Sequence, residues 1–253
     1  MTRDKQDGAP ARGSADSAAA DARRCAGVTI RAITFDVGGT LIEPWPSTGH
    51  VYAEMAAQFG VTGMAPDQLT ENFRRAWKTR DHFDYSRESW FALVRATFGE
   101  VAARLPAAYF PAVFERFAEA GAWHVYEDVR PTLEALARRG VKLGVISNWD
   151  DRLRPLLARL GLADYFSSVV ISCEVGAAKP DSRLFHQAAA ELAVTPGELV
   201  HVGDSYAMDV LGAEKMGAIA RQVVRSGTAL EPWQIRSLRD VEALLLRQDA
   251  AAK

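Results

Sequence analysis

Short apolar runs and amphipathic helical stripes alternate over much of the chain. The runs are rich in β-branched residues, as is typical of buried strands, and they lie just before Asp36 and at residues 141–147, 168–172, 199–203 and 219–224. Stripes with helical spacing separate them, at residues 129–139 and from Leu153 and Leu184 onward. Strands that alternate with helices in this way predict an α/β fold, in which a parallel sheet is covered by helices on both faces.

One long segment interrupts this alternation, because from about residue 44 to residue 123 every periodic stretch is helical. Its apolar stripes are Val51, Met55 and Phe59; Leu69, Phe73 and Trp77; Trp90, Leu93, Val94 and Phe98; and Phe110, Val113, Phe114 and Phe117. Each stripe gives a helix one apolar face, and such faces can bury one another as a small bundle. We therefore predict an inserted α-helical cap at residues 44–123 and an α/β core formed by residues 28–43 and 124–253.

Residues 1–27 are expected to form a disordered tail. They are rich in Ala, Gly, Ser, Asp and Arg and have no large apolar residue after Met1, so they cannot bury enough surface to fold alone. They contain no continuous apolar stretch of the kind that a secretory signal requires, and no stretch of the chain reaches the length of a membrane span.

Composition narrows the kinds of partner. The net charge of -2 and the pI near 6.2 give no basic footprint for nucleic acid and no polybasic membrane patch, so a small-molecule substrate is favoured. Cys25 and Cys173 offer neither a disulfide framework nor a zinc cluster, which is typical of a reducing compartment. We therefore expect a cytoplasmic protein that binds neither nucleic acid nor membrane, and the aromatic cap stripes leave its oligomeric state open.

Candidate chemistry begins at the end of the first strand. Asp36 follows an apolar run and is itself followed by Gly38 and Gly39. In an α/β sheet, ligands bind outside the carboxyl ends of parallel strands, and glycines let backbone N–H groups approach a phosphate closely. Taken alone, Asp36 is more simply explained as a turn carboxylate that caps the next segment.

Three later segments carry polar residues at comparable places. They are Ser147 and Asn148 after the strand at 141–147, Lys179 directly before a helix, and Asp204 at the end of the strand at 199–203 with Asp209 five residues later. Taken singly, Ser147 fits a helix cap, Lys179 fits a solvated loop, and aspartates before a helix fit capping. Their joint occurrence favours a single site at one edge of the sheet.

These segments, FDVGGTL, ISN, AKPD and VGDSYAMD, resemble the signature motifs of the haloacid dehalogenase superfamily in sequence, order and spacing, from about residue 29 to about residue 225. The helical insertion and the pattern around Ser89, Trp90 and Phe91 are similar to the superfamily's helical-cap branch, subfamily IA. The resemblance implies a hydrolase with a Rossmann-like core and a mobile cap over the active site, whose lining sets specificity.

The resemblance also implies a role for each motif residue. Asp36 is the expected nucleophile, which forms an aspartyl-phosphate, and Lys179 neutralises it together with the transferring group. The expected reaction is hydrolysis of a small phosphorylated metabolite that depends on Mg²⁺, a cation that prefers oxygen ligands. The implied magnesium ligands are Asp36, the backbone carbonyl of Gly38, Asp204 and, as a further ligand or an orienting group, Asp209. The implied substrate-binding residues are Ser147, Asn148 and Thr40.

One position departs from the pattern of the family's phosphatases. They carry a second aspartate two residues after the nucleophile, which protonates the leaving oxygen and then activates water, whereas this chain has Gly38. Acid and base help worth roughly a hundredfold to ten-thousandfold is therefore expected to be missing unless another group supplies it. Glu43 is the first candidate, and His50 and His82 in the cap are weaker ones. His201 lies on an apolar strand and is expected in the core.

Three alternatives stay open. A regulatory protein that binds magnesium and phosphate without turnover is favoured by Gly38 and opposed by Asp36 and Lys179. Carbon–halogen hydrolysis is opposed by Asp204, because the superfamily's dehalogenases need no metal and lack that acid. Carbon–phosphorus cleavage, in which a small residue occupies the position of Gly38 and a cap lysine forms a Schiff base, has Lys78 as its candidate.

Overall fold

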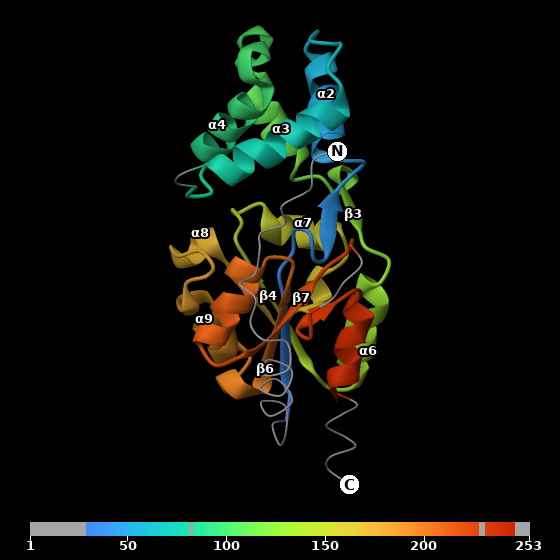
Figure 1. The fold of residues 1–253 in the computed structure, drawn as a ribbon, viewed down its shortest axis with the longest axis vertical. Coiled ribbons are helices and arrows are strands. Elements are labelled where there is room, and N and C mark those ends of the chain that lie inside the picture. The colour runs from blue at the N-terminus through green and yellow to red at the C-terminus, as the bar shows by residue number, and fades with distance from the viewer. Residues whose placement is uncertain (1–28, 81–82, 228–230, 246–253) are drawn as a thin grey trace.

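The computed structural model describes residues 29–80, 83–227 and 231–245, and the structural statements below concern these ranges. In Figure 1 a sheet surrounded by helices forms the lower part of the molecule, and a group of helices forms the upper part. The tail expected at residues 1–27, which includes Cys25, lies outside the described residues, as does His82. In the described ranges, no helix has both the length and the apolar character needed to cross a membrane.

The central sheet of the lower part is parallel. Its strand order is β5-β4-β1-β6-β7-β8, and every neighbouring pair has parallel register. The strands are β1 (Ala32–Phe35), β4 (Lys142–Ser147), β5 (Ser168–Ile171), β6 (Leu199–Gly203), β7 (Ile219–Val223) and β8 (Gln234–Ile235). Because β1 lies between β4 and β6 and all three run the same way, their carboxyl ends meet at one edge.

Helices cover both faces of this sheet. They are α6 (Val129–Arg138) and α7 (Leu153–Arg159) on one face, and α9 (Ser182–Glu191) and α10 (Leu211–Lys215) on the other. Successive side chains of a strand point to opposite faces, so β1 gives Ile33 and Phe35 to the first core and Ala32 to the second. The predicted α/β fold, with a Rossmann-like parallel sheet between two helical layers, is confirmed.

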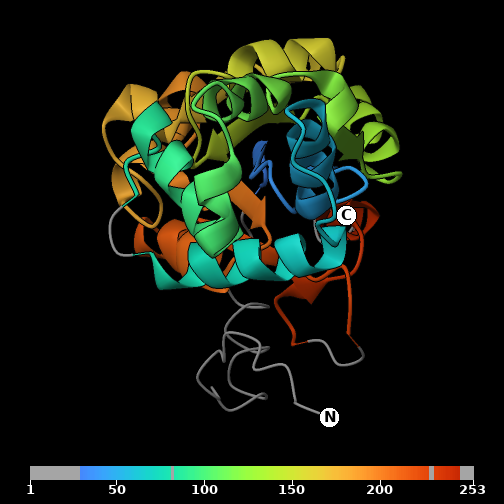
Figure 2. The ribbon, with the colours of Figure 1, turned by 90° about the horizontal axis from the view of Figure 1, so that it is seen from above.

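The upper part is a bundle of the helices α2 (Thr48–Gln58), α3 (Pro66–Thr79), α4 (Arg87–Phe98) and α5 (Tyr109–Arg116), which we call the helical insertion. They lie on the predicted stripes, because Met55, Leu69, Val94 and Val113 share one buried cluster. The Tyr109 hydroxyl, buried at the centre, donates a hydrogen bond to the backbone carbonyl of Tyr52 at 3.1 Å. Seen from above in Figure 2, these helices lie over the sheet.

Side-chain caps help to define where helices begin. The Ser47 and Ser86 hydroxyls accept hydrogen bonds from the first turns of α2 and α4, and the Asp181 carboxylate does so for α9. The remaining helical segments are short: α8 (Ser172–Val175), the 3₁₀ turns Gly99–Arg104, Ala120–Ala122, Ala163–Tyr165, Pro196–Glu198 and Leu238–Val241, and a π turn at Tyr206–Val210.

Two short strands that the sequence patterns missed join the two parts. β2 (Ile42–Pro44) and β3 (Trp123–Val125) pair antiparallel, so the chain leaves the sheet and returns to it through adjacent strands. Strands of this length are too short to show a period of two, and β8 was missed for the same reason. The pair forms the neck on which the helical insertion stands.

The carboxylate of Asp128 connects the C-terminal segment to the rest of the lower part. It accepts two hydrogen bonds from Arg225 Nη1 at 2.9 and 2.8 Å, one from the Ser237 hydroxyl at 2.8 Å and one from the Leu238 N–H at 2.8 Å. Arg225 Nη2 also donates to the carbonyl of Thr40 at 2.6 Å. Asp128 therefore steadies the loop that follows the central strand.

We predict that Asp128→Asn lowers the free energy of unfolding by about 1 to 3 kcal/mol at neutral pH, because several donors lose their charged acceptor. Burial raises the pKa of the Asp128 carboxyl, but the donors from Leu238, Ser237 and Arg225 outweigh burial and hold that pKa below its usual range. Its stabilising effect is therefore complete above a pH of about 4 and is lost as the pH falls through the lower folded-state pKa. Urea unfolding at several pH values should show the two proteins converging in acid; a difference that does not change with pH would contradict this account.

Candidate functional site

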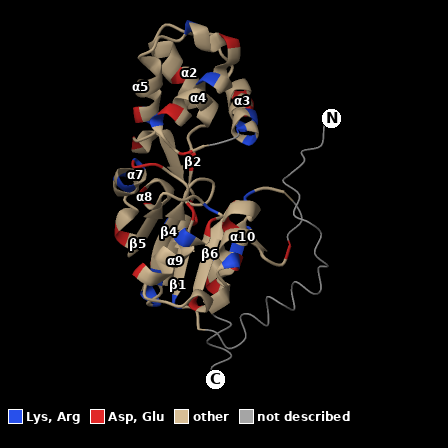
Figure 3. Cartoon of the chain, turned by 90° about the vertical axis from the view of Figure 1, so that its left-hand side faces the viewer, with Lys and Arg blue, Asp and Glu red and all other residues tan. Residues whose placement is uncertain are grey.

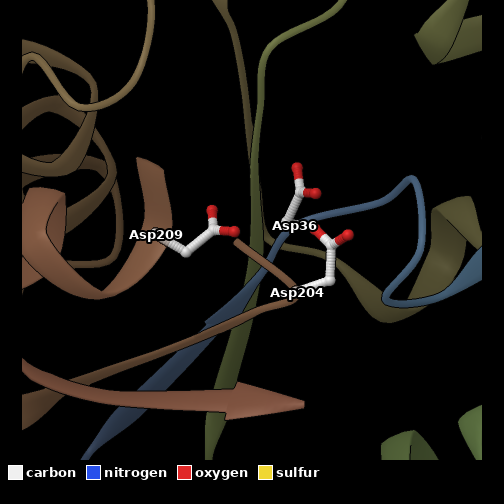
Figure 4. Close-up of side chains that lie close together, drawn as sticks. All are labelled: Asp36, Asp204 and Asp209. Atoms are coloured by element: carbon white, nitrogen blue, oxygen red, sulfur yellow. The ribbon is translucent and has the colours of Figure 1, made fainter. Parts of the chain in front are cut away.

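The carboxyl edge of the sheet brings acidic side chains from distant segments together. Asp36 follows β1, Asp204 follows β6, and Asp209 lies in the π turn beyond it. Figure 4 shows these side chains side by side, and each offers a carboxylate oxygen within 4.8 Å of the others. This arrangement places like charges together at the carboxyl edge of the sheet, so the ionised carboxylates require positive charge nearby.

Lys179 supplies that charge from the segment before α9. Its ammonium nitrogen Nζ lies 2.6 Å from Asp36 Oδ1 and 2.6 Å from Asp209 Oδ1, and its side chain is only 2% exposed. Ser147, at the end of β4, donates a hydrogen bond to Asp36 Oδ1 at 2.8 Å. Burial opposes the charged form of Lys179, but the carboxylates of Asp209 and Asp36 outweigh it and raise the pKa of the ammonium above its usual range.

The side chain of Asn148 contacts the backbone of Lys179. Its side-chain oxygen accepts a hydrogen bond from the Lys179 backbone N–H at 2.6 Å, and its side-chain nitrogen donates to the Lys179 carbonyl at 3.1 Å. The side-chain amide therefore holds the lysine segment in place on both sides. Any contact between Asn148 and a phosphoryl oxygen is left to its backbone N–H group.

Asp209 is held by partners at both of its oxygens. His201 Nε2 lies 3.1 Å from Oδ1, and the Ser205 N–H donates to Oδ2 at 2.9 Å. Since an ionised carboxylate can only accept, Nε2 carries the proton, while Nδ1 lies 3.0 Å from the Thr34 hydroxyl. His201 is fully buried, as its place on an apolar strand predicted, yet it also orients the site.

The electrostatics of the acidic cluster differ from one carboxylate to the next. Burial opposes ionisation of Asp209, but Lys179 and His201 outweigh it and hold the pKa of its carboxyl below the usual range. The Asp204 side chain is exposed on the side of the cavity. Desolvation by the surrounding protein and the negative charges of Asp36 and Asp209 raise the pKa of its carboxyl to about 7. Among the described residues, the three carboxylates of Asp36, Asp204 and Asp209 therefore carry more negative charge than Lys179 offsets. Such a site suits a divalent cation held by oxygen ligands.

Glycines let the backbone pass close to these carboxylates. Gly39 has a φ of +74°, and a Cβ there would lie 2.5 Å from Asp204 Oδ2. A Cβ at Gly203 would lie 2.1 Å from Asp209 Cγ. A Cβ at Gly38 would lie 3.3 Å from the indole ring of Trp149, so an aromatic ring borders the space where the family's second aspartate would begin.

A cavity of about 970 Å³ separates this edge of the sheet from the helical insertion. Most of the predicted site residues line it, namely Asp36, Gly38, Ser147, Asn148, Lys179, Asp204 and Asp209. Thr40 does not: its side chain is fully buried, and its carbonyl accepts from Arg225. The substrate contact expected for Thr40 therefore has no support in the geometry.

Two of the residues considered as substitutes for the missing acid, Glu43 and His50, do not line this cavity, and the third, His82, lies outside the described residues. Glu43 lies in β2, where its Oε2 accepts a hydrogen bond from the Tyr126 hydroxyl at 3.2 Å. His50 Nδ1 lies 2.9 Å from the Ser47 hydroxyl at the start of α2. By contrast, Lys78, the candidate for Schiff-base chemistry, does line the cavity.

Tyr85 is a site residue that the sequence patterns did not single out. It belongs to the loop between α3 and α4, is buried, and has a φ of +62°, which is unusual for a bulky side chain. Its hydroxyl interacts with the side chains of Arg80 and Asn148 and lies in the field of Lys179 and Asp36. Burial raises the pKa of Tyr85, so the hydroxyl stays protonated at neutral pH. The feature that marks Tyr85 is its backbone conformation, which a pattern of apolar and polar residues does not reveal.

Comparison with known proteins identifies relatives over most of the chain. Residues 30–217 match the family described as haloacid dehalogenase-like hydrolase. Haloacid dehalogenase-like hydrolase domain-containing protein 3 of Danio rerio is 34% identical over 202 residues, which cover 75% of this chain and 83% of the relative. A phosphoserine phosphatase from Thermus thermophilus is 38% identical over 124 residues, which cover 49% of this chain and 50% of the relative.

Solved structures show the same fold with more than one chemistry. A HAD phosphatase from Thermococcus onnurineus is similar with a TM-score of 0.61 and 28% identity, covering 85% of this chain and 98% of that one. A 2-haloacid dehalogenase from Pseudomonas syringae pv. Tomato DC3000 is similar with a TM-score of 0.59 and 27% identity, covering 87% and 100%. The choice between these chemistries therefore depends on the site residues rather than on the fold.

We predict that Gly39→Ala weakens Mg²⁺ binding by at least roughly tenfold, because its Cβ would displace the Asp204 carboxylate. Gly140→Ala is the matched control, since Gly140 has a φ of +75° and open space around it. Both variants should lose about 1 to 2 kcal/mol of stability from backbone strain. Calorimetric titration with Mg²⁺ separates them, and unchanged affinity in Gly39→Ala would show that Asp204 is not a ligand.

Proposed function

The chain belongs to the haloacid dehalogenase-like hydrolase family, and we propose that within it this protein is a magnesium-dependent phosphatase of a small phosphorylated metabolite. The observation that carries the proposal is the Lys179 ammonium, buried between Asp36 and Asp209 with the Asp204 carboxylate beside them. A nucleophile next to a fixed cation, with a further carboxylate that can help to hold Mg²⁺, suits transfer of a dianionic phosphoryl group. The phosphatases among its relatives agree with this choice.

Asp36 is the proposed nucleophile. Ser147 and Lys179 both donate to its Oδ1, so the carboxylate is oriented before substrate arrives. A carboxylate oxygen forms a bond to phosphorus while the ester P–O bond breaks, and the leaving oxygen takes up a proton. Water then attacks the phosphorus of the aspartyl-phosphate, which releases inorganic phosphate and restores the carboxylate. Lys179 neutralises the charge on the transferring group throughout.

We assign the magnesium ligands to Asp36, the backbone carbonyl of Gly38 and Asp204. When bound, the ion supplies positive charge to the phosphoryl oxygens. Asp209 has a different part, because both of its oxygens are already engaged by Lys179, His201 and Ser205. Asp209 accepts a hydrogen bond from the Lys179 ammonium and so holds the lysine in position without binding the ion itself.

Gly38 leaves the departing oxygen without the usual proton donor. The ring of Trp149 borders that space, and Glu43 and His50 do not line the cavity. We propose that the Tyr85 hydroxyl, which lines the cavity from the insertion, donates a hydrogen bond to a phosphoryl oxygen. Substrates with good leaving groups are therefore favoured, and the helical insertion acts as the cap that excludes water.

A second candidate function is a regulatory protein that binds magnesium and a phosphate compound without turning it over. The absence of a carboxyl at Gly38 favours it. The orientation of the Asp36 carboxylate by two donors opposes it, because binding alone does not require a positioned nucleophile. Activity measurements separate the two functions.

We predict that the protein hydrolyses an activated aryl phosphate in the presence of Mg²⁺ and that a chelator abolishes the activity. Asp36→Asn should lose at least about a thousandfold in kcat, because the amide is a poor nucleophile. Asp164→Asn, the same chemical change at an exposed position away from the cavity, is the matched control. Turnover that survives in Asp36→Asn would contradict the mechanism, and no release of phosphate across a broad panel of phosphate esters would favour the regulatory function.

We predict that Gly38→Asp raises kcat for an unactivated alkyl phosphate by roughly tenfold or more, because it restores an acid next to the leaving oxygen. Gly38→Asn has nearly the same shape and no titratable proton, so it is the control. Trp149→Phe combined with each variant relieves crowding at the indole ring. If the aspartate and asparagine variants have the same rate in both backgrounds, the missing acid is not what limits this enzyme.

A further inference from the structure

Trp77, Phe83 and Trp90 form an aromatic cluster that belongs to none of the hydrophobic cores. The ring centroids of Trp77 and Trp90 lie 5.8 Å apart in a stacked arrangement with an 18° interplanar angle. Phe83 meets Trp77 at 5.2 Å and Trp90 at 4.8 Å, edge to face in both cases. All three side chains are only half-buried, whereas the bundle core lies elsewhere in the insertion. The ring of Phe73, which packs against the bundle core, stacks on Trp77 at 6.0 Å, so the cluster extends the bundle while part of each of its side chains stays exposed.

The two tryptophans of the cluster face the same cavity as the proposed nucleophile. Trp77 and Trp90 line it from the insertion, while Asp36 and Lys179 line it from the sheet. Further aromatic residues continue this lining: Phe73, Phe114, Trp123 and Trp149. A cavity of about 970 Å³ is far larger than a phosphoryl group needs, and apolar walls with a few placed polar groups are typical of sites for sizeable organic ligands.

The aromatic wall has a defined position relative to the phosphate end of the cavity. The Trp90 indole N–H donates to Asp150 Oδ2 at 2.7 Å, and Asp150 follows Asn148 by two residues. The Arg152 side chain holds that carboxylate by two hydrogen bonds, from Nε at 2.7 Å and Nη2 at 2.6 Å, and its backbone N–H donates a third at 3.1 Å. Arg152 also donates to the carbonyl of Phe114 in the insertion. The wall is thus tied to the loop that carries the predicted phosphate contacts.

Polar groups of Arg80 and Tyr85 lie between Trp77 and the lysine segment, whereas the ring of Trp149 lies directly beside Gly38. The Arg80 guanidinium carbon lies 3.3 Å from the centroid of the Trp77 ring, and the Arg80 side chain interacts with the Tyr85 hydroxyl. Tyr85 in turn interacts with Asn148 beside Lys179. On the side of the insertion, the cavity therefore presents a hydroxyl and a guanidinium between the carboxylates and ammonium of the sheet edge and the rings of Trp77 and Trp90.

We propose that the substrate is a phosphate monoester whose alcohol part carries a planar aromatic ring, and that Trp77 and Trp90 bind this ring. This inference rests on the phosphatase function proposed above and names its substrate class. Arg80, Phe73 and Trp90 cover part of the Trp77 ring, and the indole surface that stays exposed would gain from contact with another ring through burial of apolar area and through aromatic pairing. The polar groups of Arg80 and Tyr85 match the charged phosphate end of such an ester.

The test compares phenethyl phosphate with ethyl phosphate, whose leaving alkoxides differ little in basicity. The wild-type protein should show a kcat/KM for the phenethyl ester at least about tenfold higher, and Trp77→Ala should lower kcat/KM for the phenethyl ester more than for the ethyl ester and so remove most of that advantage. Trp77→Leu keeps apolar bulk without a flat ring and should behave similarly, which guards against a folding defect in the alanine variant. Trp45→Ala is the matched control, because Trp45 is 53% exposed and does not line the cavity.

Two outcomes separate this inference from the proposed function. If the wild-type protein hydrolyses both esters equally well and neither Trp77 variant changes the ratio, the aromatic substrate class is wrong and the phosphatase function stands. If neither ester is hydrolysed, the phosphatase function fails for them, and calorimetry in Mg²⁺ with the Asp36→Asn variant decides the inference. Tighter binding of phenethyl phosphate that Trp77→Ala removes supports the aromatic wall, and equal binding of both esters overturns it.

Discussion

The ammonium of Lys179, buried between the carboxylates of Asp36 and Asp209, is the interaction on which the site depends. A charge taken out of water is costly unless it is paired and its partners are themselves hydrogen-bonded, and here Ser147 and His201 complete that pairing. The lysine therefore fixes the proposed nucleophile, Asp36, and the carboxylate of Asp209 at once. Figure 3 shows that Lys, Arg, Asp and Glu occur in both parts of the molecule. Among the residues that the structure describes, the buried lysines and arginines are Lys179, Arg152 and Arg221.

The topology of the sheet explains why such distant residues meet. Because β1 is flanked by β4 and β6 in parallel register, the residues that follow these strands share one edge without any long loop. The neck of β2 and β3 then sets the helical insertion above that edge, so the chemistry comes from the sheet and the far wall of the cavity from the insertion. This division lets one fold serve phosphatases and dehalogenases, as the solved relatives illustrate.

Sequence patterns predicted the parts of this structure that are long or chemically distinctive. The buried strands, the helices of the insertion and the segments around Asp36 and Lys179 belong to that group, because periodicity and motif spacing report them directly. Three-residue strands carry too little periodicity, and the positive φ of Tyr85 leaves no mark on composition. Trp77 and Trp90 were assigned to bundle stripes, yet they face the cavity, since a stripe shows which residues share a helix face but not what that face meets. Sequence patterns also do not show that the Asn148 side chain hydrogen-bonds to the backbone of Lys179, because that contact is tertiary.

The most direct test of the central claim is to quench the protein in acid during turnover of an activated aryl phosphate and to analyse its peptides by mass spectrometry. The account predicts one added phosphoryl group on the peptide that contains Asp36, formed only when Mg²⁺ is present. Cleavage of the ester with no label on that peptide, or with the same labelling in a chelator, would show that the nucleophile and the cation site do not form one centre.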